Sequence, residues 1–243
     1  MVSSRRRLTI MAHVTNTMPV ANPARVGLNL SEFSSMIQAL PLCLALALIS
    51  TIYASVGQAG ASGFIAVMVL FGIAAGSIKP MALVLNVLVS AVVMWRFWRA
   101  GFLSWQRLWP FAVSSAPAAF IGGYLSLPAV IFNAVLGTLL LIASIPLLLR
   151  RSPIEQDFTP PSLPLACLAG GVIGFLSGLT GMGGGILLAP LLIYCRWSDT
   201  RTAAGISAAF ILLNSVIALA GFCSAGNGLP TEWFLYALAA VSG

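Results

Sequence analysis

Gly174–Pro190 reads GFLSGLTGMGGGILLAP, an uncharged segment in which glycine is too frequent for an ordinary helix. It lies within residues 158–195, which carry no charge. That stretch is long enough to cross a bilayer, since a spanning helix needs roughly 20 apolar residues. Each glycine in a helix interior costs about 1 kcal/mol relative to alanine. Backbone that leaves the helix within a membrane is tolerated where it is buried in protein or lines a cavity. The segment therefore predicts a break between two helical pieces, and the break is a candidate binding site.

The composition of the whole chain is that of a helical membrane protein. Hydrophobic residues make up 59% of the 243 residues and charged residues only 7%. Soluble domains carry about 25% charged residues. The charges are also segregated, and long stretches contain none: 33–78, 80–95, 108–149, 158–195 and 202–231. The pattern predicts an all-α fold, a polytopic transmembrane helical bundle in the cell membrane.

The apolar segments set the expected helices. We predict them near residues 37–56, 63–76, 80–98, 108–125, 130–149, 163–180, 185–195, 203–222 and 231–243. The segments 63–76 and 185–195 are too short to span a bilayer, because a helix rises about 1.5 Å per residue. Each is expected to be a half-helix that follows a glycine break.

The segments fall into two halves around a polar linker. We expect residues 1–35 to be a disordered polar extension and residues 36–150 to form a first transmembrane repeat. A polar, proline-rich linker then covers residues 151–162, and a second transmembrane repeat covers residues 163–243. The second half contains fewer apolar segments than the first, so we expect its last helix to be missing.

The two halves share a spacing of residues. Ser55 is followed by Gly63 as Ser177 is followed by Gly185, and a later helix in each half carries an asparagine, Asn86 or Asn214. This similarity predicts an internal repeat. Such repeats are typical of secondary transporters, whose substrate site lies at the repeat interface.

The glycine breaks have a chemical use. A helix that resumes after Gly181–Gly185 exposes its first amides and the positive end of its dipole, which together attract an anion. An equivalent turn is expected at Gly60–Gly63, and the two half-helix ends are expected to meet. The candidate substrate-binding residues are Gln58, Ser62, Gly63, Asn86, Thr180, Gly181, Gly183, Gly184, Gly185 and Asn214.

Each candidate has a structural alternative. Serine and threonine hydroxyls in membrane helices often bond to the carbonyl one turn earlier, which is the favoured reading for Ser177. The asparagines are also compatible with an interhelical hydrogen bond, worth about 0.6 kcal/mol on average. Close helix packing is the favoured reading for four more glycines: Gly170, Gly171, Gly174 and Gly178.

The segment GFLSGLTGMGGGILLAPLL, followed by the helix that bears Asn214, resembles the second-half motif of the sulfite exporter TauE/SafE family, also called the toluene-sulfonate uptake permease family. The first half, from Tyr53 to Val93, resembles a subgroup with an SVG-x-GGASG stretch, although Gln58-Ala59 replaces the His-Gly expected there. The resemblance covers roughly residues 40–243. It implies a secondary transporter that moves sulfite, sulfonates or related anions by alternating access. An anion channel and a non-transporting scaffold remain as alternatives.

Several functions are disfavoured by what the sequence lacks. The one histidine, His13, lies in the extension, and the carboxylates flank the apolar segments, so we expect no enzyme, no metal and no cofactor. The net charge of +7 comes from basic residues in loop positions, which indicates lipid contact rather than nucleic-acid binding. The expected partners are a small anion and the bilayer, and a homo-oligomer is left open.

Overall fold

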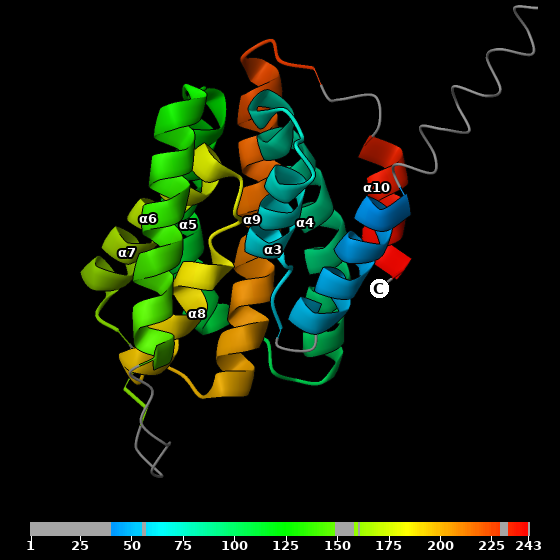
Figure 1. Cartoon of the computed structure of the whole chain (residues 1–243). Coiled ribbons are helices and arrows are strands. Elements are labelled where there is room, and N and C mark those ends of the chain that lie inside the picture. Colours follow the sequence, from blue (N-terminus) through cyan, green and yellow to red (C-terminus); the bar gives the residue numbers. More distant parts are fainter. Residues whose placement is uncertain (1–39, 55–56, 149–157, 160, 229–232, 243) are drawn as a thin grey trace, which may run out of the picture. The chain divides into compact units, whose positions relative to one another are not determined.

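The computed structural model describes residues 40–54, 57–148, 158–159, 161–228 and 233–242. The chain divides into residues 1–41 and a second unit, residues 42–243, with which the following account is concerned. Throughout the described ranges, every regular element is an α-helix, which confirms the predicted all-α class (Figure 1). The predicted extension 1–35 and most of the linker 151–162 lie outside the described residues.

The predicted helices are found, with small shifts at their ends. An apolar helix covers Leu40–Ala54. It is followed in chain order by α3 (Ala61–Leu70), α4 (Ala75–Arg99), α5 (Trp105–Tyr124), α6 (Ala129–Leu148), α7 (Leu163–Thr180), α8 (Gly185–Tyr194), α9 (Thr200–Ser224) and α10 (Trp233–Ser242).

The largest differences from the prediction are at α3 and α4: α3 ends at Leu70 instead of near residue 76, and both helices begin earlier than predicted. Helix α4 begins at Ala75, so Pro80 lies inside the helix instead of opening it. Helix α3 begins at Ala61, so Gly63 lies within the helix and not in the turn that precedes it. The turn itself ends at Gly60, which has a left-handed backbone with φ of 81°.

The helix lengths fit a membrane protein. Three described helices are long and apolar enough to cross a membrane: Gly76–Arg99, Leu163–Thr180 and Thr200–Ser224. Helices α3 and α8 have 10 residues each. A 10-residue helix is about 15 Å long, roughly half of the hydrocarbon thickness. Both predicted half-helices are therefore too short to span the bilayer, as expected.

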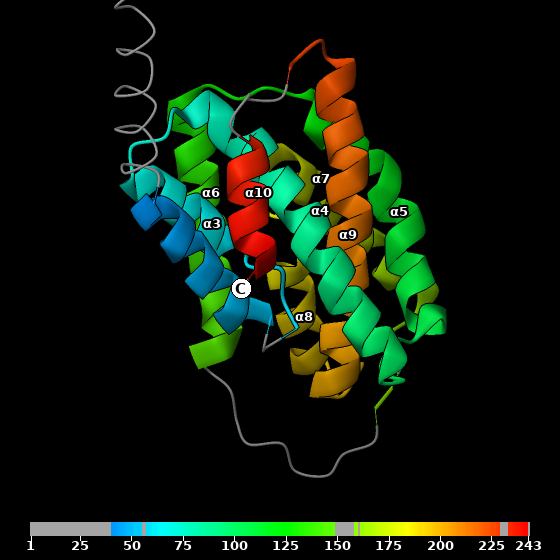
Figure 2. The same cartoon turned by 90° about the vertical axis from the view of Figure 1, so that its right-hand side faces the viewer.

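The side chains of the second unit form two apolar clusters. One gathers around α3 and α4, and includes Phe64, Ile65 and Met68. The other lies among α5, α7, α8 and α9, and includes Phe111 and Phe210. The long helices α4 and α9 pack against each other, with the start of each near the end of the other (Figures 1 and 2).

Helices α5 and α7 pack through glycine. A Cβ on Gly170 would lie 2.5 Å from the Phe111 carbonyl oxygen, and a Cβ on Gly174 would lie 2.6 Å from the Cα of Ser115. The backbone of α5 approaches Gly178 in the same way, at Ala119. The packing role expected for these three glycines is confirmed. Gly171 is different, because its nearest such neighbour lies 3.8 Å away, at an ordinary contact distance.

Candidate functional site

The second glycine turn, residues 181–184, joins α7 to α8 by a backbone that requires glycine. Gly181, Gly183 and Gly184 have φ values of 79°, 71° and 78°. These lie in the left-handed region, where other residues are strained. Gly181 ends α7, and its N–H donates to the Ser177 carbonyl at 2.8 Å. Gly184 is the N-cap of α8.

The N-terminus of α8 has no side-chain cap. The neighbouring α9 is capped, because a carboxylate oxygen of Asp199 accepts from the backbone N–H of Arg201 and of Thr202, both at 3.1 Å. The first amides of a helix have no partner within the helix, and they bind anions readily. At α8 the Leu187 and Leu188 N–H groups donate to the Gly184 carbonyl, and no side chain caps the amides before them.

Helix α4 contacts the second glycine turn through Asn86, which is fully buried. Its side-chain Nδ2 donates to the Gly181 carbonyl at 2.9 Å. The same nitrogen lies 3.3 Å from the position that a Cβ would take on Gly183. The Oδ1 atom of Asn86 has no hydrogen-bond partner. The amide nitrogen of Asn86 therefore holds the turn, and its amide oxygen is free to accept a hydrogen bond.

Helix α9 covers the turn from another side. The Ile211 side chain lies against both Gly183 and Gly185, and Ser215 Oγ lies 3.1 Å from the Cβ position of Gly183. Ser207, Asn214 and Ser215 are fully buried. Because a helix turns once every 3.6 residues, these three residues share one face with Ile211. That face is polar and lies on the turn.

Six buried polar atoms on the helices that contact the turn lack partners. They are Asn86 Oδ1, Ser177 Oγ, Ser207 Oγ, Asn214 Nδ2, Asn214 Oδ1 and Ser215 Oγ. The Cβ of Ser177 lies 3.3 Å from the Cβ position of Gly184, which places this serine at the turn as well. Each unsatisfied buried group costs about 1–3 kcal/mol. Such a concentration in one place needs an explanation, and a bound polar ligand supplies one.

Lys79 lies beside the turn, but its charge is used elsewhere. Its Nζ donates to the carbonyls of Gly122 and Gly123 at 3.0 Å, and to that of Leu125 at 2.8 Å. These carbonyls are at the C-terminal end of α5, where a cation is favourable. The part of Lys79 that lies against Gly181 is its backbone and the carbons of its side chain.

The first glycine turn, residues 57–60, has the same backbone signature with φ of 81° at both Gly57 and Gly60. Its surroundings are different. The Tyr53 hydroxyl and Ser62 Oγ are hydrogen-bonded to each other at 3.1 Å. A Cβ on Gly57 would meet the Cβ of Ala204 and lie 2.9 Å from the Phe97 ring.

Of the predicted site residues of the first half, Asn86 lies at the second turn, whereas Gln58, Ser62 and Gly63 lie in or just after the first turn. Gln58 is partly exposed, and its backbone N–H donates to the Tyr53 carbonyl at 3.0 Å. Gly63 packs against the Leu40–Ala54 helix, because its Cβ position lies 2.5 Å from Ile49 Cγ2. Along α4, Asn86 and Phe97 mark the second and first turns and lie about 16 Å apart. Along α9 the corresponding contacts, Ala204 and Ile211, are only about 10 Å apart, and Met182 of the second turn shares a buried cluster with Ala59 of the first. The expected meeting of the two half-helix ends stays a prediction.

The hydroxyls of Thr180 and Ser177 differ from the hydrogen bonding expected of them. Thr180 Oγ1 donates to the Leu176 carbonyl at 2.7 Å, the bond one turn back that was the alternative to ligand binding. Ser177, for which that bond was the favoured reading, has no partner. Ser207 and Ser215 were not predicted. A signal for them exists, because Ser207, Asn214 and Ser215 recur with the helical period.

The fold and this turn define the class of the protein: a polytopic α-helical membrane protein with glycine-broken half-helices around buried polar groups. The family model described as sulfite exporter TauE/SafE matches residues 42–243, and the chain belongs to that family. It is 42% identical over 210 residues to "Probable membrane transporter protein y4hK" of Sinorhizobium fredii, an alignment that covers 84% of this chain and 85% of that protein. No solved structure matches the chain. Family membership indicates an integral membrane transporter rather than an enzyme, and it confirms the resemblance found in the glycine motif.

Proposed function

We propose that the protein is a secondary transporter of small sulfur-containing anions, and that its substrate binds at the second glycine turn. The observation that carries this proposal is the set of buried, unpartnered polar atoms beside the uncapped N-terminus of α8. An oxyanion accepts hydrogen bonds, and this place offers donors from both backbone and side chains. The family name supports the choice of sulfur oxyanions.

The donors surround the turn from three helices. Helix α7 contributes the hydroxyl of Ser177, and α9 contributes the hydroxyls of Ser207 and Ser215 and the amide nitrogen of Asn214. The first amides of α8 add backbone donors with the favourable end of a helix dipole. Asn86 holds the Gly181 carbonyl in place and thereby keeps the turn in its binding shape.

Alternating access is supported by the relation between the halves. Helices α3 and α8 both have 10 residues, and α4 and α9 both have 25. Gly57 and Gly181 are separated by the same number of residues as Gly60 and Gly184. These equalities support an internal repeat, but in a register that differs from the predicted one. Gly60 rather than Gly63 matches the second half at its turn, and the position of Asn86 in α4 corresponds to Ile211 in α9, not to Asn214.

Each long helix also lies against the turn of the other half. Helix α4 meets the second turn at Lys79 and Asn86, whereas α9 meets the first turn at Ala204. A rocking motion of one half against the other would therefore move α4 relative to the bound anion. This is the motion that opens a site alternately to the two sides of the membrane.

A pair of equivalent serines provides the test. Ser90 and Ser215 occupy the same position in α4 and α9, and both are fully buried. The Ser90 hydroxyl donates to the Asn86 carbonyl, whereas the Ser215 hydroxyl has no partner. In proteoliposomes, Ser215→Ala should weaken the apparent affinity for methanesulfonate or sulfite by about tenfold, since a hydrogen bond to a charged ligand is worth about 1.5–3 kcal/mol. Ser90→Ala should leave the affinity close to that of the parent protein.

The same assay separates the mechanisms. A carrier gives saturable flux and counterflow, in which unlabelled anion on one side drives labelled anion inward from the other. Flux that is linear in concentration and lacks counterflow would identify a channel. Absence of flux for every sulfur anion, together with no thermal stabilisation by any of them, would contradict the transport proposal, because a ligand of the native state raises its stability.

A further inference from the structure

We propose that the second glycine turn selects oxyanions with a single negative charge, and that it excludes those with two. This inference rests on the transport function proposed above and specifies its substrate class. The favoured ligands are a sulfonate and hydrogensulfite, and the excluded ones are the sulfite and sulfate dianions.

All the unpartnered groups at the turn are neutral. They are hydroxyls from Ser177, Ser207 and Ser215, and amide atoms from Asn86 and Asn214. All five side chains are at most 1% exposed, so bulk water does not replace missing ligand contacts. Neutral donors hold an anion through dipoles, and the charge of the anion remains uncompensated by any full opposite charge.

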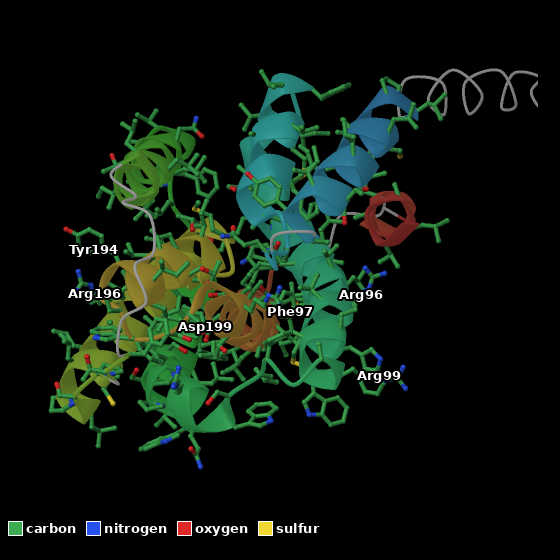
Figure 3. All side chains as sticks on the ribbon, turned by 90° about the horizontal axis from the view of Figure 1, so that it is seen from below. Arg96, Phe97, Arg99, Tyr194, Arg196 and Asp199 are labelled. Carbon is green, nitrogen blue, oxygen red and sulfur yellow. The ribbon has the colours of Figure 1, made fainter. Side chains whose placement is uncertain are left out.

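The nearby positive charges are directed elsewhere. Lys79 uses its ammonium group on the three carbonyls at the end of α5 and over the ring of Phe222, whose centroid lies 5.8 Å away. Arg96 and Arg99 at the end of α4, and Arg196 after α8, point outward at one end of the bundle (Figure 3). In the described parts of the chain, no group of three His, Cys, Asp or Glu side chains is placed to hold a metal ion that would add positive charge.

The electrostatics distinguish one charge from two. The desolvation free energy of an ion rises with the square of its charge, so a dianion loses about four times as much as a monoanion on entering the same site. The N-terminus of α8 returns the equivalent of roughly half a positive charge. That compensates half of a monoanion but only a quarter of a dianion. The neutral donors therefore favour a single charge over two.

The number of acceptors points the same way. A sulfonate presents three oxygens around one charge, which matches the several hydroxyl and amide donors that lack partners. Asn86 Oδ1 and Asn214 Oδ1 accept hydrogen bonds and would repel a fully ionised ligand. Hydrogensulfite carries a proton on one oxygen in its O-protonated form, and that proton can be donated to one of these carbonyl oxygens. The sulfite dianion has no proton to donate.

The test compares anions of fixed and variable charge in proteoliposomes that contain the whole chain. Methanesulfonate keeps one charge at every pH used, and sulfate keeps two. Sulfite changes from one to two charges near neutral pH. We expect methanesulfonate flux that changes less than about twofold across this range, and sulfite flux that falls about tenfold per pH unit above its second ionisation, because the monoanion falls by that factor. Sulfate in excess should not compete with methanesulfonate.

The outcomes separate this inference from the function on which it rests. If sulfate, or sulfite at the higher pH, competes with methanesulfonate as strongly as hydrogensulfite does, charge selection is wrong and the transport function stands. If methanesulfonate flux follows pH as sulfite flux does, the protein itself titrates and the inference is again wrong. If none of the anions moves faster than through protein-free liposomes, the transport function fails and takes this inference with it.

Discussion

The two glycine turns have nearly the same backbone and opposite surroundings. Each places a left-handed glycine immediately before a 10-residue helix, Gly60 before α3 and Gly184 before α8. Neither helix has a side-chain cap. At the first turn the neighbouring hydroxyls of Tyr53 and Ser62 bond to each other. At the second turn three serine hydroxyls, both amide atoms of Asn214 and the amide oxygen of Asn86 have no partners.

If the second turn is the binding site, as we propose, an uncapped helix N-terminus is not enough to make one. Both turns offer backbone amides with the same polarity, so the backbone alone does not choose between them. The choice comes from the side chains that α4 and α9 bring to each turn. At equivalent positions these helices present Ala204 to the first turn and Lys79 to the second. Substitutions that change one turn and leave the other intact test this difference between the turns.

The largest effect is expected from Asn214→Asp, which places a negative charge among the polar groups of the second turn. Two like charges at close range in a partly dehydrated site repel by several kcal/mol, so anion flux should fall by about a hundredfold or more. Asn133 of α6 supplies the matched control, because Asn133→Asp adds the same charge at an exposed position. Flux should be measured in proteoliposomes after the folded fraction has been checked by gel filtration. Normal flux in folded Asn214→Asp protein would place the anion elsewhere.

Lys79→Met should have the next largest effect, and it should act on stability. The substitution keeps the length of the side chain but leaves the carbonyls of Gly122, Gly123 and Leu125 without their donor. Loss of a buried charged donor costs roughly 3 kcal/mol. We expect a lower thermal midpoint in detergent and an affinity for methanesulfonate within about twofold of the parent value, since the ammonium group does not contact the ligand. A large rise in KM with normal stability would show instead that Lys79 binds the anion.

Alanine at the two N-cap glycines tests the packing around each turn. Both Gly60→Ala and Gly184→Ala put a Cβ on a left-handed backbone, which costs about 1–2 kcal/mol. A Cβ at Gly184 would also lie 2.9 Å from the Phe210 ring and 3.0 Å from Ile173, whereas the closest atoms to a Cβ at Gly60 are 3.3 Å away. Gly184→Ala should therefore be the more destabilising by about 1 kcal/mol or more, as read from thermal midpoints in detergent. Equal losses would mean that Phe210 and Ile173 move aside without cost.

The helical framework of this protein is predictable because its signals are local. Charge-free stretches show where the apolar helices lie, and the run from Gly181 to Gly185 marks the break between α7 and α8. The predicted start of α4 was wrong because proline is typical of the first turn of a helix, whereas Pro80 lies inside α4. Proline lacks an N–H, but the carbonyl it leaves free can be satisfied by neighbours in a packed membrane helix.

The site is less predictable because it depends on contacts between distant segments. Gly63 was assigned to the first turn from its spacing, yet it serves close packing against Ile49. The sequence alone does not distinguish a glycine needed for close packing from one needed for a left-handed turn. The hydrogen bond from Asn86 to Gly181 joins residues from different halves, and no local pattern indicates it. The role proposed for Ser215 likewise depends on its hydroxyl having no hydrogen-bond partner in the folded chain.

The smallest effect is expected at the first turn, from Tyr53→Phe. The substitution removes the hydroxyl that bonds to Ser62 Oγ and keeps the ring that packs over Gly60 and Gly63. Ser62 can then donate to a carbonyl one turn back, as serines in helices do, so the net loss of stability should be below about 1 kcal/mol. Methanesulfonate affinity should change less than about twofold, whereas Ser215→Ala removes a single hydroxyl of the second turn and should change it about tenfold. Equal losses of affinity in the two variants would mean that both turns hold the anion during the transport cycle, and the asymmetry between them would then be a property of one state alone.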